Sequence, residues 1–368
     1  MAKNGMRVGL DLEQTSIAGA QIKGNKAGQT LSAAAVRALP EGLVYEGEVV
    51  DVEGLAAEMK SFWKEGGFSG KKVCLGIANQ KIVVRTLDLP LVDGKELEAA
   101  VQFQAQEAIP IPIDEAVLDH QVIATAPNDD GNGGSQKVLL VAAQRDMVTQ
   151  FVEAAGKAGL SVDGIDLQAF ALARAIAPPV PFIDQGSPEP AEASALVNIG
   201  SGITNIVVVS GGAPRFTRVI NLGYEALVAA LANNRGISPA EADALRLSVG
   251  LSGGAQVPVG DLEQETVDEI HQVLDGAAEA FADEIRRSVD YYHSQDNPGH
   301  VGRLLLSGEG SLTRNISEYL AQSLHMDVRL GDPLQHVSDN TSKIAQADLQ
   351  VIAPRLSIAV GLALEDEE

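Results

Sequence analysis

Residues Ala195 to Pro214 read ALVNIGSGITNIVVVSGGAP. Two apolar runs rich in Val and Ile flank a short turn, which is the pattern of a β-hairpin. The turn contains several small residues, namely Gly200, Ser201, Gly202 and Thr204. Glycine lets an anion approach successive backbone N–H groups, so the tip of this hairpin could hold phosphate. Ordinary turn chemistry explains the same residues and stays open as the alternative.

The segment from Met6 to Gly28, MRVGLDLEQTSIAGAQIKGNKAG, follows the same plan. An apolar strand carries an acid, Asp11, near its end, and a second strand begins after the pair Thr15 and Ser16. Two such hairpins facing each other could clamp a polyphosphate from both sides. The sequence therefore predicts that the chain carries this hairpin twice.

Composition narrows the class of protein. The chain has 368 residues, enough for about two domains. Its net charge of -23 repels a nucleic-acid backbone and disfavours direct attachment to anionic lipid. Cys74 is expected to be a buried structural thiol. The sequence shows neither a signal peptide nor an apolar run long enough to span a membrane, so we expect a cytoplasmic protein without direct membrane insertion.

Strand and helix patterns alternate along the chain, which indicates α/β architecture. Residues Asp93 to Ile109 predict a helix stopped by Pro110 and Pro112, and residues 118–177 predict a β-β-α-β-α run. The Pro-rich and acidic residues 177–193 are the best candidate for a linker. Beyond it we expect helices over 225–233, after Ser238 as N-cap, over 265–293 and over 312–324.

Two further segments carry polar groups that could meet a ligand. An apolar strand enters a turn with Gly308 and Gly310 before a helix, where backbone N–H groups are available to an anion. Glu284, Arg287 and Ser288 share one face of the long helix. The carboxylate could accept from ribose hydroxyls while the guanidinium stacks on adenine. A surface ion pair on a helix explains the same residues.

The order of these elements resembles the actin-like nucleotide-binding superfamily. Within it the chain resembles the PilM family of type IV pilus assembly proteins, which is related to the cell-division protein FtsA. The resemblance covers essentially the whole chain and rests on segments such as LDLPLVDGKELEAAVQFQAQEAIPIPI, EIRRSVDYY and IAVGLAL.

This resemblance implies an α/β, actin-like (ribonuclease H-like) fold of two lobes. The first lobe would span residues 1–195, with an inserted α/β subdomain at about 87–159. The second lobe would span 196–354. Residues 355–368 would form a C-terminal helix that returns to the first lobe, followed by an acidic tail.

The resemblance also implies a nucleotide, ATP or ADP, with Mg²⁺ held in part by Asp11. The implied nucleotide-binding residues are Asp11, Thr15, Ser16, Asn198, Gly200, Ser201, Gly202, Thr204, Glu284, Arg287, Ser288, Gly308 and Gly310.

Three departures from the family pattern argue against efficient hydrolysis. Glu13 stands where the family has glycine, and a carboxylate about 4 Å from phosphate costs about 4 kcal/mol before screening at an effective dielectric of about 20. Asn198 replaces an acid that organises metal and water, and Gln104 and Gln106 replace acids in the helix before Ile109. We therefore expect a weakly catalytic or non-catalytic scaffold, with an active ATP-dependent kinase or ATPase as the alternative.

The family resemblance further implies a membrane partner. In that family the inserted subdomain receives the N-terminal cytoplasmic peptide of PilN, so we expect a PilN-like partner that holds this protein at the cytoplasmic membrane. The apolar residues expected to line the peptide groove are Val101, Phe103, Ile109 and Ile111. Packing in the subdomain's own core is the alternative, and self-association stays open.

Overall fold

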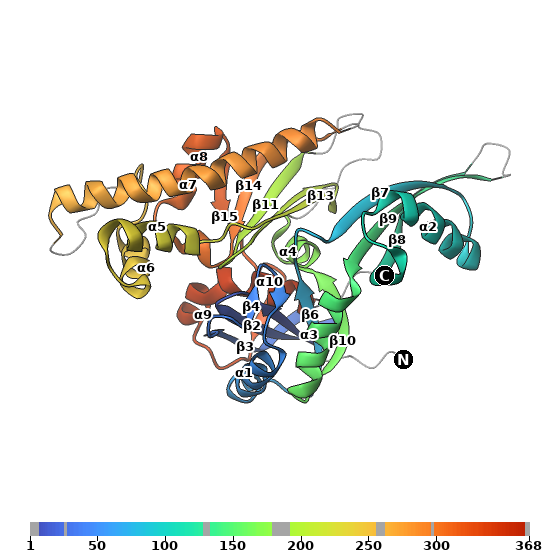
Figure 1. Cartoon of the computed structure of the whole chain (residues 1–368), viewed down its shortest axis with the longest axis horizontal. Coiled ribbons are helices and arrows are strands. Elements are labelled where there is room, and N and C mark those ends of the chain that lie inside the picture. The colour runs from blue at the N-terminus through green and yellow to red at the C-terminus, as the bar shows by residue number, and fades with distance from the viewer. Residues whose placement is uncertain are drawn as a thin grey trace. The chain divides into compact units, whose positions relative to one another are not determined.

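The computed structural model describes residues 7–25, 28–127, 133–178, 192–254, 262–295 and 298–364 (Figure 1). The chain divides into two compact units. The main unit contains residues 1–78 and 155–368, and the inserted unit contains residues 79–154. Strands and helices alternate in both units, which confirms the α/β class.

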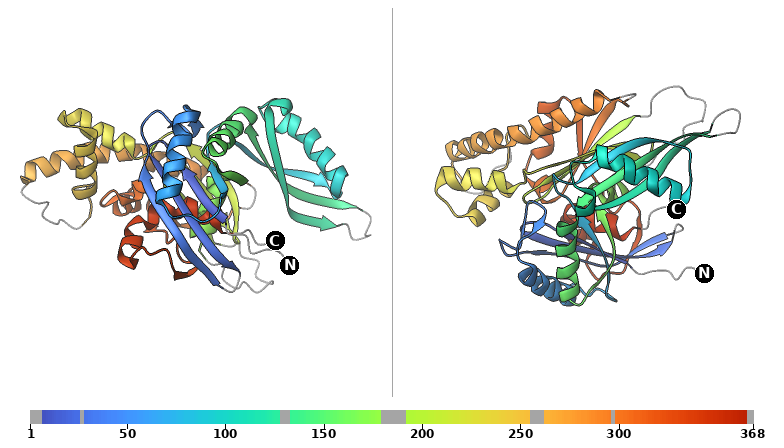
Figure 2. Two further views of the ribbon diagram at one scale, coloured as in Figure 1. Left: turned by 90° about the horizontal axis from the view of Figure 1, so that it is seen from below. Right: turned by 45° about the vertical axis from the view of Figure 1, so that its right-hand side comes forward.

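The first lobe of the main unit is built on a six-stranded sheet of order β10-β6-β1-β2-β3-β16. Its strands are β1 (Arg7–Leu12), β2 (Ser16–Asn25), β3 (Gly28–Ala38), β6 (Lys72–Ile77), β10 (Ser161–Leu167) and β16 (Val337–Asn340). β1 pairs antiparallel with β2 and parallel with β6. Helix α1 (Val52–Glu65) covers the face of this sheet at β2 (Figure 2). The rings of Phe62 and Phe68 lie against Gly19 of β2.

The second lobe is built on a five-stranded sheet of order β13-β12-β11-β14-β15. Its strands are β11 (Ala193–Ile199), β12 (Thr204–Ser210), β13 (Ala213–Ile220), β14 (Val301–Ser307) and β15 (Asp327–Leu330). This order repeats β3-β2-β1-β6-β10 of the first sheet, including the antiparallel hairpin and the parallel strand beside it. The repeat confirms that the chain carries the hairpin twice.

Helices of the second lobe pack on this sheet and on one another. They are α5 (Glu225–Arg235), α6 (Pro239–Ser248), α7 (Gln264–His293) and α8 (Ile316–Leu324). The core residues of α7 recur every three or four positions, as a one-sided helix requires (Figure 1). Ser238 caps α6 in a capping box with Glu241, as expected. Within the described ranges, no helix is both long and apolar enough to cross a bilayer.

Two short helices join the lobes. Helix α4 (Gln168–Ile176) contacts strands of both sheets, and α10 (Ser357–Ala363) packs on α4 and β1. The approach is close because glycine stands at the contacts. A Cβ at Gly361 would lie 1.8 Å from the carbonyl oxygen of Ala171, and one at Gly9 would lie 2.0 Å from that of Ala359.

The chain returns to the first lobe earlier than residue 355. β16 (Val337–Asn340) pairs in parallel with β3, so the return begins about 18 residues before that position. This short, half-exposed strand has little apolar periodicity, so its pairing could not be read from the sequence. Most of the expected linker 177–193, and the acidic tail, lie outside the described residues.

The inserted unit is a three-stranded antiparallel sheet of order β7-β9-β8. Its strands are β7 (Val83–Pro90), β8 (Ala116–Pro127) and β9 (Gly134–Gln144), and its helices are α2 (Gly94–Ala108), the 3₁₀ turn η1 (Ile113–Glu115) and the start of α3 (Arg145–Lys157). The unit begins before Leu87 because β7 already pairs with β9 at Val83. β8, β9, α3, β10 and α4 form the expected β-β-α-β-α run.

The close packing of α10 gives a test of the joint between the lobes. We expect Gly361→Ala to lower the free energy of unfolding by about 2 kcal/mol or more, because its Cβ would meet a backbone oxygen that cannot move aside. Gly276→Ala in α7, where a Cβ meets nothing within 4 Å, is the control and should raise stability by up to about 1 kcal/mol. If urea unfolding gave the same change in the free energy of unfolding for both variants, this account of the joint would be contradicted.

Candidate functional site

The tip of the second hairpin is a turn held on both sides. The N–H of Gly200 donates to Ile203, and the N–H of Tyr224 donates back to the carbonyl of Gly200 at 2.9 Å. A Cβ at Gly223 would lie 1.9 Å from the Ser201 carbonyl oxygen, so glycine is required where the chain enters α5. Thr204 is buried, and its hydroxyl donates to the Leu222 carbonyl at 2.6 Å. The turn is therefore rigidly placed.

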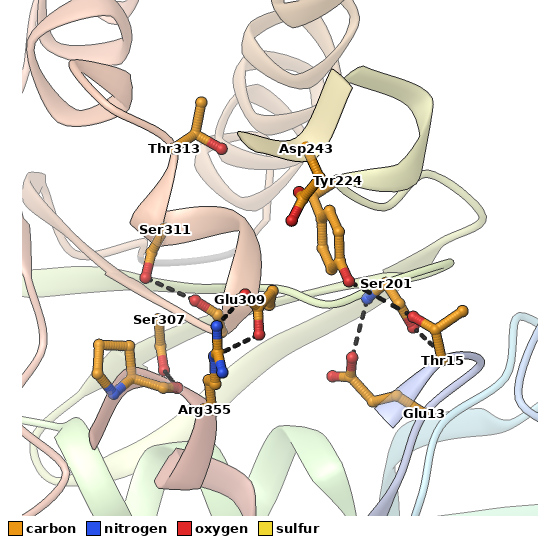
Figure 3. A network of polar contacts seen from close by, with 12 residues as sticks. Glu13, Thr15, Ser201, Tyr224, Asp243, Ser307, Glu309, Ser311, Thr313 and Arg355 are labelled. Carbon is orange, nitrogen blue, oxygen red and sulfur yellow. Dashed lines mark hydrogen bonds and ion pairs between the residues drawn. The ribbon is translucent and has the colours of Figure 1, made fainter. Parts of the chain in front are cut away.

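The tip of the first hairpin lies directly against this turn. The N–H of Ser201 donates to Oε2 of Glu13 at 2.8 Å, and the N–H of Thr15 donates to Oγ of Ser201 at 3.3 Å (Figure 3). A Cβ on Gly200 would lie 2.5 Å from Oε1 of Glu13. The Glu13 carboxylate thus takes the place in the turn that an external anion would need.

Gly202 and Ser16 complete the two tips. A Cβ on Gly202 would lie 2.4 Å from Oε1 of Gln14. Ser16 begins β2, and its carbonyl accepts from the Glu13 N–H at 2.9 Å. The predicted hairpin residues are therefore brought together, but they contact one another directly.

Burial changes the acid chemistry of Glu13. Burial raises the pKa of Glu13 to about 7, with a smaller push from the Glu309 charge, while the Ser201 N–H opposes the rise. A group with this pKa is partly protonated near neutral pH. In either state one of its oxygens can accept the hydrogen bond from Ser201.

Asp11 is buried below the tips, where it bonds to an amide. Nε2 of Gln168 donates to Oδ1 of Asp11 at 2.7 Å, and Nδ2 of Asn205 donates to Oε1 of Gln168 at 2.9 Å. Burial, and then the charge of Glu13, raise the pKa of Asp11 well above its usual range. A raised pKa weakens this carboxyl group as a ligand for Mg²⁺, which binds the charged form.

Asn198 does not supply the missing charge. Its buried Nδ2 makes no hydrogen bond of normal geometry within the described part of the chain, although the amide is near enough to Glu13 to favour that group's charged form. Among the described residues, no three or more His, Cys, Asp or Glu side chains are grouped to hold a metal ion. The donor set around Asp11 therefore does not fit Mg²⁺.

The turn after β14 also lies at this site. Gly308 has φ 83°, and a Cβ there would lie 2.4 Å from the Ile199 carbonyl oxygen. A Cβ on Gly310 would lie 2.2 Å from the Ile199 side chain. The N–H of Gly308 donates to the Pro354 carbonyl at 3.0 Å, so this donor is already used. The helix expected from Leu312 begins only at Ile316, after the 3₁₀ turn η2 (Glu309–Leu312).

The expected nucleoside residues on α7 make other contacts. Both oxygens of Glu284 bind guanidinium groups, at 2.9 Å from Arg218 of β13 and 2.5 Å from Arg287. Ser288 is fully buried, and its hydroxyl donates to the Glu284 carbonyl at 2.7 Å. These contacts match the surface ion pair that was the alternative for Glu284 and Arg287.

Sequence reasoning missed a buried charged network around Arg246 of α6. The Arg246 guanidinium lies 4.5 Å from the centre of the Tyr224 ring and donates to Thr313 at 2.7 Å and to Asp243 at 2.8 Å. Its side chain is 0% exposed, which is rare for arginine. An arginine on the inward face of the helix pattern in SPAEADALRLS was the signal that could have pointed to it.

The network continues to the end of the chain through Glu309. Arg355 forms an ion pair with both oxygens of Glu309, at 2.5 Å for the Nη2–Oε1 contact, and Arg246 lies 3.9 Å from the same carboxylate (Figure 3). Burial raises the pKa of Glu309, and the two arginines oppose the rise. Two cations thus hold one buried acid beside the hairpin tips.

All four expected peptide-binding residues belong to the inserted unit, and three of them are buried in its core. Val101, Ile109 and Ile111 are at most 7% exposed and belong to its core, where they pack with β9. The expectation that they line an open groove is corrected, because α2 needs this face to cover its own sheet. Only Phe103 is open to a partner, at 67% exposed.

The raised pKa of Glu13 predicts a pH-dependent stability. A raised folded-state pKa means that the contribution is fully present below about pH 4.5 and is lost as pH rises to about 7. We therefore expect Glu13→Gln to become more stable relative to wild type across this window, by about 1 kcal/mol or more. Thermal unfolding at several pH values measures the difference in stability between the variant and wild type.

Glu269→Gln, which alters an exposed ion pair with Arg235, is the control. A difference that stays flat would contradict the burial of Glu13.

Comparison with known proteins identifies a family model that matches this chain and solved structures that are similar to it. The model of the type IV pilus assembly protein PilM family matches residues 9–367. A chain of the solved PilM-PilN type IV pilus biogenesis complex is 25% identical, with a TM-score of 0.79 over 98% of both chains. MreB5 of Spiroplasma citri bound to ADP has a TM-score of 0.53 at 11% identity, over 96% of this chain and 94% of that one, which shows a common fold.

A more distant sequence relative is the cell division protein FtsA of Escherichia coli (strain K12). It is 23% identical over 214 residues, which cover 54% of this chain and 49% of FtsA. The chain thus spans about half the length of the curated relatives it matches. The expected actin-like fold is confirmed by these likenesses and by the repeated sheet. Because the family match extends over nearly all of its length, the chain belongs to the type IV pilus assembly protein PilM family.

Proposed function

We propose that this protein is an actin-like scaffold of type IV pilus assembly that does not turn over nucleotide efficiently. The observation that carries the proposal is the hydrogen bond from the Ser201 N–H to the Glu13 carboxylate at 2.8 Å. The donor that would meet a phosphate oxygen is bound by the chain's own acid. ATP or ADP binds only if Glu13 first leaves the turn, so we expect weak affinity.

The chemistry of phosphoryl transfer supports this proposal. Hydrolysis requires a positioned water, a metal ion and compensation for phosphate charge. Here Asp11 is bonded to Gln168, and Asn198 offers an amide where a second carboxylate would bind metal. The alternative, an active ATP-dependent kinase or ATPase, is favoured by none of the contacts described above.

We further propose that the inserted unit binds the N-terminal cytoplasmic peptide of a PilN-like membrane protein, which would place this chain at the cytoplasmic membrane. β8 is an edge strand, and its residues 121–126 are exposed, including Val122 at 39% and Ile123 at 42%. An edge strand with apolar side chains can pair with an extended peptide. Residues 79–154 contain seven more acidic than basic residues, which favours a basic peptide.

Restoring the family residues tests the nucleotide part of the proposal. We expect the double variant Glu13→Gly with Asn198→Asp to bind Mg-ATP at least about tenfold more tightly than wild type, because it removes about 4 kcal/mol of unscreened repulsion and frees the turn. Isothermal titration calorimetry measures the affinity, with Glu269→Gln as the control. Wild type should release phosphate from Mg-ATP well below about 1 s⁻¹.

Two results would count against this assignment. Binding that is unchanged or weaker in the double variant would mean that phosphate does not lie at the hairpin tips. Steady phosphate release by wild type at an ordinary enzymatic rate would favour the kinase or ATPase.

The peptide surface is tested by placing positive charge on it. Ile123→Lys and Phe103→Lys are each expected to weaken binding of a PilN-like N-terminal peptide about tenfold, because each replaces an apolar contact with a charge that repels a basic partner. Val351→Lys in α9 (Gln346–Ile352) is the control, since Val351 is 67% exposed, as is Phe103. Full binding by both folded variants, measured by fluorescence anisotropy, would exclude this surface.

A further inference from the structure

Besides the link from Asp11 through Gln168 to Asn205, polar contacts between the two lobes of the main unit gather at two places. The first is the pair of hairpin tips, which we name the tip latch and define by Glu13, Gln14 and Thr15 with Ser201 and Glu225. Besides the bonds to Ser201, Nε2 of Gln14 donates to Oε2 of Glu225 at 2.9 Å. Four groups of residues 13–15 therefore contact the other lobe directly.

The second place is the chain's return to the first lobe, which we name the return latch. It consists of the turn Ser307–Glu309 of the second lobe against Pro354, Arg355 and Ser357. Oγ of Ser307 donates to Oγ of Ser357 at 2.5 Å, and the Gly308 N–H donates to the Pro354 carbonyl at 3.0 Å. The Arg355–Glu309 ion pair closes this contact with opposite charges.

Tyr224 and Arg246 connect the two latches. The Tyr224 hydroxyl lies 3.4 Å from Oγ1 of Thr15, and the ring carries the Arg246 guanidinium on its face. Arg246 in turn lies 3.9 Å from Glu309. Burial raises the pKa of Tyr224 to about 12, so its hydroxyl keeps its proton at neutral pH. The polar groups therefore form one continuous path from the first hairpin to Arg355. Figure 3 shows its two ends, at Glu13 with Ser201 and at Glu309 with Arg355.

The burial of this path explains why it matters energetically. A buried acid or arginine that loses its partner costs several kcal/mol, so the partners hold one another in place. Tips built to be joined by a ligand would carry donors and acceptors that only the ligand could pair. Here the Ser201 N–H has Glu13 as its acceptor, and Glu309 has two cations.

We infer that the carboxylates of Glu13 and Glu309 replace a nucleotide as the bridge between the lobes, so the main unit stays closed without ligand. The inference deepens the proposed function, on which it rests for the role of the hairpin tips. It adds that the scaffold has one constant conformation rather than a closed state that a nucleotide must induce. Closure of the lobes and the rate of hydrolysis are separate properties, which can be measured independently.

Hydrogen exchange on the full chain tests this directly. In wild type we expect the amides of residues 13–16 and 200–203 to exchange at the same slow rate with and without excess Mg-ATP. Glu13→Ala and Glu309→Ala should each raise these rates about tenfold or more, because each opens one latch. Glu269→Gln removes an ion pair within the second lobe and should leave the rates unchanged. If Glu309→Ala does not fold, Arg355→Gln weakens the same ion pair from its other side.

Two outcomes would overturn the inference. The first is a wild-type protein whose tip amides gain protection, and whose radius of gyration in solution scattering falls, when Mg-ATP is added. The second is unchanged exchange in every latch variant. Phosphate release is assayed separately on the same samples. Suppose that wild type hydrolyses ATP steadily while its tip amides exchange equally slowly with and without Mg-ATP. That result would refute the proposed function but would support the inference about the latches.

Discussion

The Oε2 atom of Glu13 lies 2.8 Å from the backbone nitrogen of Ser201, and this contact requires the tips of two hairpins to touch. Touching tips leave no room for a side chain on either side of Ser201 in the second turn. Gly200 and Gly202 are therefore glycines because Glu13 and Gln14 fill the space of a Cβ. In a phosphate-binding turn the same glycines would admit a ligand. Glycine in this turn can thus make room either for a phosphate or for a neighbouring side chain, and here Glu13 occupies the space at Gly200.

The tips can meet because the lobes are joined at close range elsewhere. Gly9 and Gly361 let α10 pack at backbone distance from β1 and α4, and α4 contacts strands of both sheets. Gln168 at the start of α4 links Asp11 of the first lobe to Asn205 of the second through its amide. The joint is therefore built from close backbone contacts and from this amide link.

Local patterns in the sequence were sufficient for most elements of the fold. The 30-residue helix α7, the cap at Ser238 and both hairpins follow from periodicity, capping and turn residues, which act over a few positions. The pairing of β16 with β3 joins residues about 300 positions apart in a short, polar strand, so no local signal marks it. Long-range pairing of this kind is decided by the completed sheet.

The site was predictable to the same extent and for the same reason. The hairpin residues were identified because they share a turn, and Glu13 was identified because it stands where the resemblance implies a glycine. Arg246 and Glu309 lie 63 positions apart and meet only after α6 folds onto the β14 turn. In the inserted unit, apolar residues such as Ile109 and Ile111 are equally compatible with a binding groove and with a core. They lie in the core because α2 covers its own sheet.

A scaffold places different demands on this architecture from an enzyme. An enzyme of this kind needs a site that opens for substrate and closes around it, so some of its polar groups must wait without partners. A scaffold must present the same surfaces at all times, and partly buried ion pairs such as Glu309 with Arg355 favour a single arrangement because each partner is costly to leave unpaired. The edge strand β8 belongs to a unit with its own core, so the proposed binding of a peptide would not depend on nucleotide chemistry. Under the proposed function, a lost phosphate site and a retained two-lobed fold are compatible, since the contact between Glu13 and Ser201 would join the lobes where a ligand otherwise would.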